Sequence, residues 1–139
     1  ILAGEGGDPV IVKAAALLHD IGIPEAERKH GSAAGRFQEL EGPPVARAIM
    51  QRLEMDEETI DSVCRIVGSH HSAKDADTPE FRVVWDADNL VNIPEEHPQA
   101  ARETLARLIE RRLRTKTGRK LAETSDWYQA AAPGDVKQE

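Results

Sequence analysis

The stretch DPVIVKAAALLHDIGIP, residues 8–24, predicts the class of the fold. Asp8-Pro9 is a helix-start signal, with a carboxylate at the N-cap and proline in the first helical position. Residues 10–18 are apolar on nearly every side of such a helix, which predicts a buried central helix. The helix runs into the polar pair His19-Asp20, and burying that pair is costly unless partners satisfy it.

Working outward from this stretch, the rest of the chain also favours helices. No strand-like alternation, internal repeat or linker stands out. We therefore expect an all-α, single-domain bundle of about five to seven helices over residues 1–129, with a flexible tail at 130–139. Residues 24–42 are expected to be irregular, with short helical turns around 25–29 and 33–40. The further helices are expected at 43–53 (opened by Pro43-Pro44), from Asp56 to Gly68, from Thr78-Pro79 through Val91, at 98–113, and near 120–123 after an interruption at Gly118.

Composition agrees with packed helices. The chain has 139 residues, 40% of them hydrophobic but only 4% aromatic, so Leu, Ile, Val and Ala must build the core. The formal net charge is −7, and basic residues concentrate only at 107–120, so we expect no sequence-specific nucleic-acid partner. A single cysteine favours a reducing, cytoplasmic setting, and no apolar run approaches the ~20 residues that span a membrane. The sequence leaves the oligomeric state open.

Three polar clusters fall where the pattern predicts core: His19-Asp20, His70-His71 and Asp86/Asp88. Imidazole nitrogen together with carboxylate oxygen suits Mn, Fe, Zn, Ni or Co. Asp88 shares a helical face with apolar residues four before and three after it, so we expect it to point inward and Asp86 to be exposed. Each cluster alone also fits a helix cap, a solvated helix end or a surface residue. Together they favour a functional site.

The segment AALLHDIG, residues 15–22, resembles the signature of the HD superfamily of metal-dependent phosphohydrolases. His70-His71 at a helix end, Asp88 within residues 86–90, and the ending at 117–122 are similar to that family's later elements. The resemblance covers residues 9–123. It implies that His19, Asp20 and Asp88 bind a divalent metal. The family's further histidine, one helix earlier, has no counterpart here, so we expect the domain to be N-terminally incomplete.

The resemblance also leaves the number of metal ions open. Some family members hold two ions through extra histidines, and His70 and His71 match one such position. The other position aligns with Glu41, which either ligates a metal or simply favours a helix N-terminus. His30 is an alternative ligand in a loop expected to be exposed. The expected cofactor is one or two divalent ions, which include Mg as well as the transition metals above.

The function implied is hydrolysis of a small phosphorylated molecule, nucleotide-like, as a phosphomonoester or phosphodiester. A metal-activated water would attack phosphorus, with Asp20 and His19 as the catalytic residues. Candidates for binding the substrate phosphate are the basic residues Arg28, Lys29, Arg36 and Lys74, each of which also fits a plain surface charge. The cyclic-dinucleotide and alarmone branches of the family are disfavoured, because their Gly-Tyr-Pro segment and acidic pair are absent.

Two rival functions stay open. One is a catalytically inactive HD domain that binds a nucleotide as a sensor or regulatory module. The other is a helical protein-interaction module in which His19, Asp20 and Asp88 are unrelated. The distances between these side chains, together with metal binding and turnover, separate the three hypotheses.

Overall fold

A computed structural model describes residues 1–74 and 76–133 of the chain. These residues form helices and no strand, which confirms the predicted all-α class. They divide into a first unit, Gly6–Phe81, and a second unit, Ile1–Glu5 with Arg82–Glu139. The extent of the domain, 1–129, stays a prediction. Of the predicted tail, residues 134–139 lie outside the described residues.

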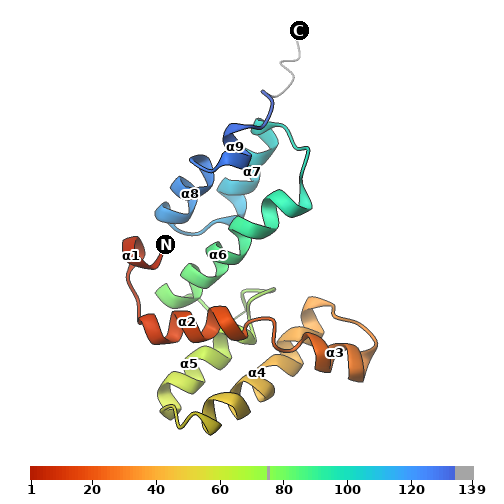
Figure 1. Cartoon of the computed structure of the whole chain (residues 1–139), viewed down its shortest axis with the longest axis vertical. Coiled ribbons are helices and arrows are strands. Elements are labelled where there is room, and N and C mark those ends of the chain that lie inside the picture. Colours follow the sequence, from red (N-terminus) through yellow and green to blue (C-terminus); the bar gives the residue numbers. More distant parts are fainter. Residues whose placement is uncertain (75, 134–139) are drawn as a thin grey trace. The chain divides into compact units, whose positions relative to one another are not determined.

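The first unit is built from four helices. They are α2 (Pro9–Leu18), α3 (Ile23–His30), α4 (Gly35–Arg52) and α5 (Glu57–Val67). In this unit α5 packs against α2 and α4, and α4 also packs against α3 (Figure 1). Aliphatic side chains dominate its core, as the composition predicts: Val12, Ala15, Ala26, Ala46, Met50, Ile60, Val63, Ile66 and Val67 are buried.

Two of these helices begin where the sequence predicts. The Asp8 carboxylate accepts a hydrogen bond from the backbone N–H of Val10 at 2.8 Å, and Pro9 follows in the first turn of α2. The Asp56 carboxylate accepts one from the backbone N–H of Thr59 at 2.9 Å and caps α5. Each bond satisfies a donor that a helix start leaves unpaired.

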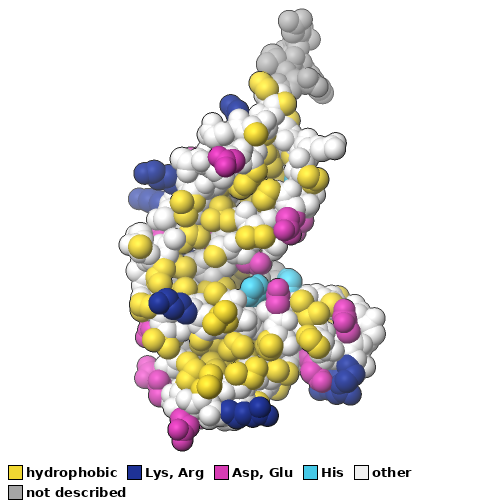
Figure 2. Space-filling model, viewed as in Figure 1, with side chains coloured by type: hydrophobic (Ala, Val, Ile, Leu, Met, Phe, Trp, Pro, Cys, Tyr) yellow, Lys and Arg dark blue, Asp and Glu magenta, His cyan; other side chains and the backbone are white. Residues whose placement is uncertain are grey.

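The prediction of a helix buried on all sides is wrong for α2. Val12 and Ala15 are buried, whereas Val10 is 55% exposed and Leu17 is 84% exposed. Within its unit α2 packs along one face against α5. Helical residues three apart share such a face, and residues on the other faces point outward. Figure 2 shows hydrophobic side chains at the surface of this unit.

Residues 24–42 are more helical than predicted, because only residues 31–34 lie outside α3 and α4, and Pro43-Pro44 does not open a helix. Both prolines lie inside α4, which starts at Gly35. One proline inside a helix costs about 3 kcal/mol, because it removes a donor and crowds the preceding turn. Packing of α4 against α3 and α5 offsets that cost. The start of α3 lies so close to α4 that a Cβ atom on Gly22 would come within 2.7 Å of the Gln38 carbonyl oxygen.

The second unit holds α1 (Leu2–Glu5), α7 (Arg102–Arg112), α8 (Lys116–Glu123), α9 (Asp126–Gln129) and all but the first turn of α6 (Pro79–Glu96). The helix start predicted at Thr78-Pro79 is confirmed by a hydrogen bond from the Phe81 N–H to the Thr78 hydroxyl. The start predicted at Pro98 is wrong, because α7 begins at Arg102, whose N–H donates to the Ala132 carbonyl. The core of the second unit consists of Ile93, Leu105, Leu108, Ile109, Leu113 and Ala122.

The predicted exposure of Asp86 is also wrong. Its side chain is fully buried and accepts hydrogen bonds from the N–H groups of Arg114 and Thr115 and from the Thr115 hydroxyl. Gly118 lies inside α8 and does not interrupt it. A glycine is needed at this position, because a Cβ atom there would overlap the Asp86 carboxylate. A charged residue can be buried here because three donors replace its water shell.

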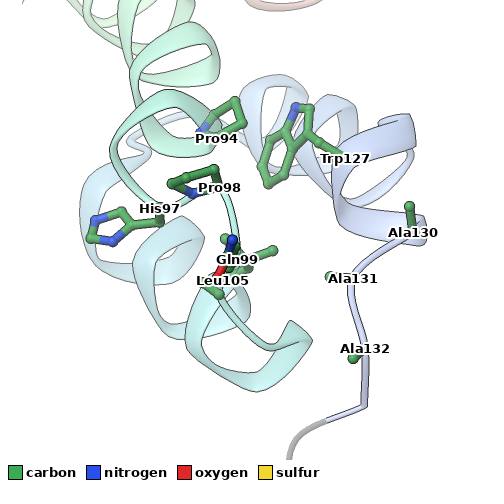
Figure 3. A pocket seen from close by; sticks show the side chains of 10 residues that line it. Pro94, His97, Pro98, Gln99, Leu105, Trp127, Ala130, Ala131 and Ala132 are labelled. Atoms are coloured by element: carbon green, nitrogen blue, oxygen red, sulfur yellow. The ribbon is translucent and has the colours of Figure 1, made fainter.

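The second unit also contains a cavity of about 390 Å³ near the end of α6. Figure 3 shows Trp127 and Pro94 on one side of it, while the His97 ring points away from Trp127. Its lining is mostly alanine, proline and tryptophan, with no cluster of metal ligands among the described residues. Within the described residues, every helix is too short or too polar to cross a membrane.

Candidate metal centre

The two histidine-containing pairs of the first unit follow the C-terminal ends of neighbouring helices. His19 is the C-cap of α2, and its backbone N–H donates to the Ala15 carbonyl at 2.8 Å. The His70-His71 pair follows the end of α5 at Val67. Because α2 packs against α5, the two polar pairs meet although 50 residues separate them in the sequence.

The carboxylate of Asp20 lies between two imidazole rings. Its Oδ2 is 3.4 Å from Nε2 of His19, and its Oδ1 is 3.5 Å from Nε2 of His70. His71 joins the same group, since Asp20, His70 and His71 offer ligand atoms that lie within 4.8 Å of one another. The structure therefore brings together His19, Asp20, His70 and His71, four of the six metal ligands predicted from the sequence.

Hydrogen bonds to the backbone set the tautomers of His19 and His70. Nδ1 of His19 lies 2.8 Å from the Ala16 carbonyl oxygen, and Nδ1 of His70 lies 2.7 Å from that of Val67. A carbonyl oxygen can only accept, so each Nδ1 carries a proton, and in the neutral ring Nε2 is the nitrogen with the lone pair. This arrangement is typical of histidine ligands, whose second nitrogen is held by a backbone or carboxylate acceptor.

The Nε2 atom of His70 is buried and has no hydrogen-bond partner among the described residues. Its distance from Asp20 exceeds the usual 2.7–3.2 Å of a hydrogen bond. The partnerless Nε2 of His70 and the carboxylate of Asp20 beside it together favour a bound cation. Two ligands with bonds of about 2.1 Å in a tetrahedral site lie about 3.4 Å apart, which matches the spacing around Asp20. The residues present therefore fit a divalent ion.

Burial sets the charge state of His70. Burial lowers the pKa of the ring below its ordinary value, and the nearby His71 and His19 act in the same direction. The hydrogen bond to Val67 and the charge of Asp20 oppose this shift without reversing it. His70 is therefore neutral at physiological pH, which is the form that can donate an electron pair to a metal.

One side of the cluster is open to solvent. The side chain of His70 is 3% exposed, whereas that of Asp20 is 55% exposed. A ligand approaching from solvent therefore meets the carboxylate of Asp20, with the imidazole of His70 behind it.

Helix α4 supports the cluster through residues that the sequence analysis missed. The Glu39 carboxylate accepts hydrogen bonds from the backbone N–H groups of His71 and Ser72, at 3.0 and 2.7 Å, and from the Ser72 hydroxyl. Gln38 contacts the His71 ring. More than 30 residues separate these partners in the sequence, and no local pattern of residues could have predicted their pairing.

Glu41 is not among the clustered side chains. It is an ion-pair partner of Lys29 at 2.7 Å and lies 3.0 Å from Nε2 of His30. A hydrogen bond from Lys29, which has the largest effect, and one from His30 hold the pKa of Glu41 below its usual value. The reading of Glu41 as a residue at a helix N-terminus is wrong, because α4 begins six residues earlier. Its role as a ligand stays a prediction.

Asp88 lies on α6 in the second unit. It is half-buried, and its Oδ2 accepts a hydrogen bond from the Asn92 side chain at 2.9 Å. Its place in the ligand set stays a prediction.

The basic candidates differ in their surroundings. Arg28 makes a two-pronged contact with Glu25, and Lys29 is held by Glu41. Figure 2 shows basic and acidic side chains next to one another over α3. Arg36 lies over the Phe37 ring, 4.6 Å from its centre. Across the part of the chain that the structure describes, no ion pair includes Arg36 or Lys74.

The first unit is therefore a helical unit with a cluster of histidine and carboxylate side chains that could hold a metal ion. The sequence model of the HD domain family matches residues 1–93, which is more than half of the chain, and the protein belongs to that family. HD domains bind divalent metal ions and are in general metal-dependent hydrolases. Neither the curated proteins nor the solved structures included a match to this chain.

Proposed function

We propose that the protein is a divalent-metal-dependent phosphohydrolase that cleaves a phosphomonoester or phosphodiester of a small, nucleotide-like molecule. The observation that carries the proposal is the buried Nε2 of His70, which faces Asp20 without a hydrogen-bond partner among the described residues. Membership of the HD domain family supports the same chemistry.

In such a site a bound divalent ion supplies Lewis acidity, polarising a phosphate oxygen and lowering the pKa of a water molecule. The residues of the chain would then have separate roles, as ligands of the ion or as the group that orients water. His19 and His70 would offer their Nε2 atoms to the ion, because the Ala16 and Val67 carbonyls hold the Nδ1 side of each ring. The Asp20 carboxylate, more than half exposed, can orient an attacking water and accept its proton.

The substrate phosphate also needs positive partners. Among the predicted residues, Arg36 and Lys74 fit best, because Arg28 and Lys29 are neutralised by carboxylates. Arg36 is exposed, and Lys74 lies three residues after His71 in the sequence. Both assignments are part of the proposal.

The experiment measures hydrolysis of p-nitrophenyl phosphate and bis(p-nitrophenyl) phosphate by protein stripped with a chelator and reloaded with Mn²⁺, Co²⁺, Ni²⁺, Zn²⁺ or Mg²⁺. We expect turnover that depends on the ion and falls by at least about 10²-fold in Asp20→Asn. The matched control is Asp61→Asn, an aspartate of the same unit whose side chain is similarly exposed, at 52% against 55%.

The two ester substrates distinguish monoesterase from diesterase activity. Equal turnover by Asp20→Asn and Asp61→Asn would contradict the proposal. Tight binding of nucleotides by the metal-loaded protein, without turnover of any ester, would replace it with the sensor hypothesis.

A further inference from the structure

The first turn of α4 carries a second contact to the histidine cluster, distinct from that of Glu39. Gln38 is buried, and its side-chain amide lies between the Ala33 carbonyl and the His71 ring. The amide nitrogen donates to the Ala33 oxygen at 2.7 Å. The amide oxygen lies 3.0 Å from Nε2 of His71. Because the amide nitrogen is used on a carbonyl, the amide orientation is unambiguous and its oxygen must accept.

This contact determines where the His71 proton lies. An amide oxygen only accepts, so Nε2 of His71 carries the proton and Nδ1 presents the lone pair. His70, its neighbour, has the opposite arrangement, with Nδ1 donating to the Val67 carbonyl. The two adjacent rings, with centroids 4.1 Å apart, thus offer opposite nitrogens.

Gly35 makes room for this arrangement. A Cβ atom at position 35 would lie 2.8 Å from Cγ and 2.9 Å from Cβ of His71, closer than real Cβ contacts. Gly35 and Gln38 are three residues apart and share a face of α4. The first turn of α4 therefore leaves room for the His71 ring at Gly35, and Gln38 holds Nε2 of that ring.

We infer that Gln38 and Gly35 are positioning residues, which make Nδ1 of His71 the atom that this ring offers to a metal ion. The inference rests on the proposed metal site. A merely structural role for Gln38, tying the turn to α4, is already filled by Glu39 through three hydrogen bonds to His71 and Ser72.

The first measurement is the tautomer of His71 in ¹⁵N-labelled, metal-free protein, read from two-bond ¹H–¹⁵N correlations. We expect the Nε2–H form for His71 and the Nδ1–H form for His70. Nδ1–H at His71 in the unaltered protein would overturn the inference without any variant. Since this readout needs neither metal nor substrate, it stands apart from the test of hydrolysis.

The second measurement compares variants. Gln38→Leu removes the acceptor and should allow both tautomers at His71, with Zn²⁺ affinity by calorimetry lowered about 10- to 100-fold. Gln38→Glu keeps an acceptor and should retain the Nε2–H tautomer with affinity close to that of the unaltered protein. The matched control is Gln51→Leu, the same change at an exposed position of α4.

Equal tautomers and equal Zn²⁺ affinity in Gln38→Leu and Gln51→Leu would overturn the inference. Gly35→Ala gives an independent test if Gln38→Leu does not fold. It should displace the His71 ring and weaken Zn²⁺ binding, and unchanged binding would contradict the role of Gly35.

Discussion

The Oδ1 atom of Asp20 lies 3.5 Å from Nε2 of His70, a spacing too long for a good hydrogen bond and suited to two ligands of one ion. His19 repeats this relationship at 3.4 Å on the other carboxylate oxygen. A buried lone pair beside a carboxylate destabilises the metal-free protein, and an ion between them removes that cost. Metal binding should therefore be coupled to stability.

We predict that a divalent ion at about 100 times its Kd raises the free energy of unfolding by about 2.7 kcal/mol. Thermal unfolding with and without ion measures the effect. His70→Ala should lose most of this gain, because it removes the buried ligand. His97→Ala, which changes a histidine of the second unit, should keep it in full. A gain that persists in His70→Ala would show that the ion binds elsewhere.

A second prediction concerns Asp86, whose role is structural. Asp86→Ala leaves the N–H groups of Arg114 and Thr115 and the Thr115 hydroxyl without their acceptor. Each unsatisfied buried group costs about 1–3 kcal/mol, so we expect a loss of several kcal/mol in urea unfolding. The matched control is Asp126→Ala, the same change at an exposed aspartate of the second unit, which should cost much less. Equal losses would contradict the assignment of Asp86.

The ion pairs of Glu41 predict a dependence of stability on pH. Contacts with Lys29 and His30 lower the pKa of Glu41 in the folded protein. The unfolded chain therefore takes up this proton first, and stability falls as the pH drops below the ordinary value of about 4.3 and through the lowered pKa. Urea unfolding between neutral and acid pH should show a steeper loss for the unaltered protein than for Glu41→Gln. If the free energy of unfolding fell equally with pH in the unaltered protein and in Glu41→Gln, this role of Glu41 would be contradicted.

Cys64, the only cysteine, offers a probe of the α4–α5 packing. The residue is 9% exposed, its thiol donates a weak hydrogen bond to the Pro43 carbonyl at 3.6 Å, and burial raises the pKa of the thiol. Because the thiolate is the reactive form, we expect alkylation by iodoacetamide at neutral pH to be slow in the folded protein and rapid in urea. Mass spectrometry follows the reaction. Fast labelling without urea would show that this part of the unit opens readily.

Local signals in the sequence were enough to predict the class of fold and several helix starts. Asp8 and Asp56 have caps that depend on residues two or three positions away, which a sequence displays directly. The helix start predicted at Pro43-Pro44 is wrong, because α4 continues through both prolines where it packs against α3 and α5.

The site shows the same division between local and long-range information. His19, Asp20, His70 and His71 could be chosen from the sequence, because polar pairs at the ends of apolar helices are unusual. The sequence predicts Asp86 on the exposed side of its helix, which is wrong. The donors that permit its burial come from residues 114 and 115, far along the chain. The contacts of Gln38 and Glu39 with His71 and Ser72 depend on the packing of α4 near the end of α5.

The most direct test of the account is anomalous X-ray diffraction from crystals of the protein grown with Co²⁺ or Zn²⁺, collected at the metal edge. The account predicts a peak at bonding distance, about 2.0–2.2 Å, from Nε2 of His70 and from an Asp20 oxygen. The same map would show whether His19, His71 and Asp88 complete the shell. An anomalous peak elsewhere, or none near Asp20 and His70 at full metal loading, would contradict the account.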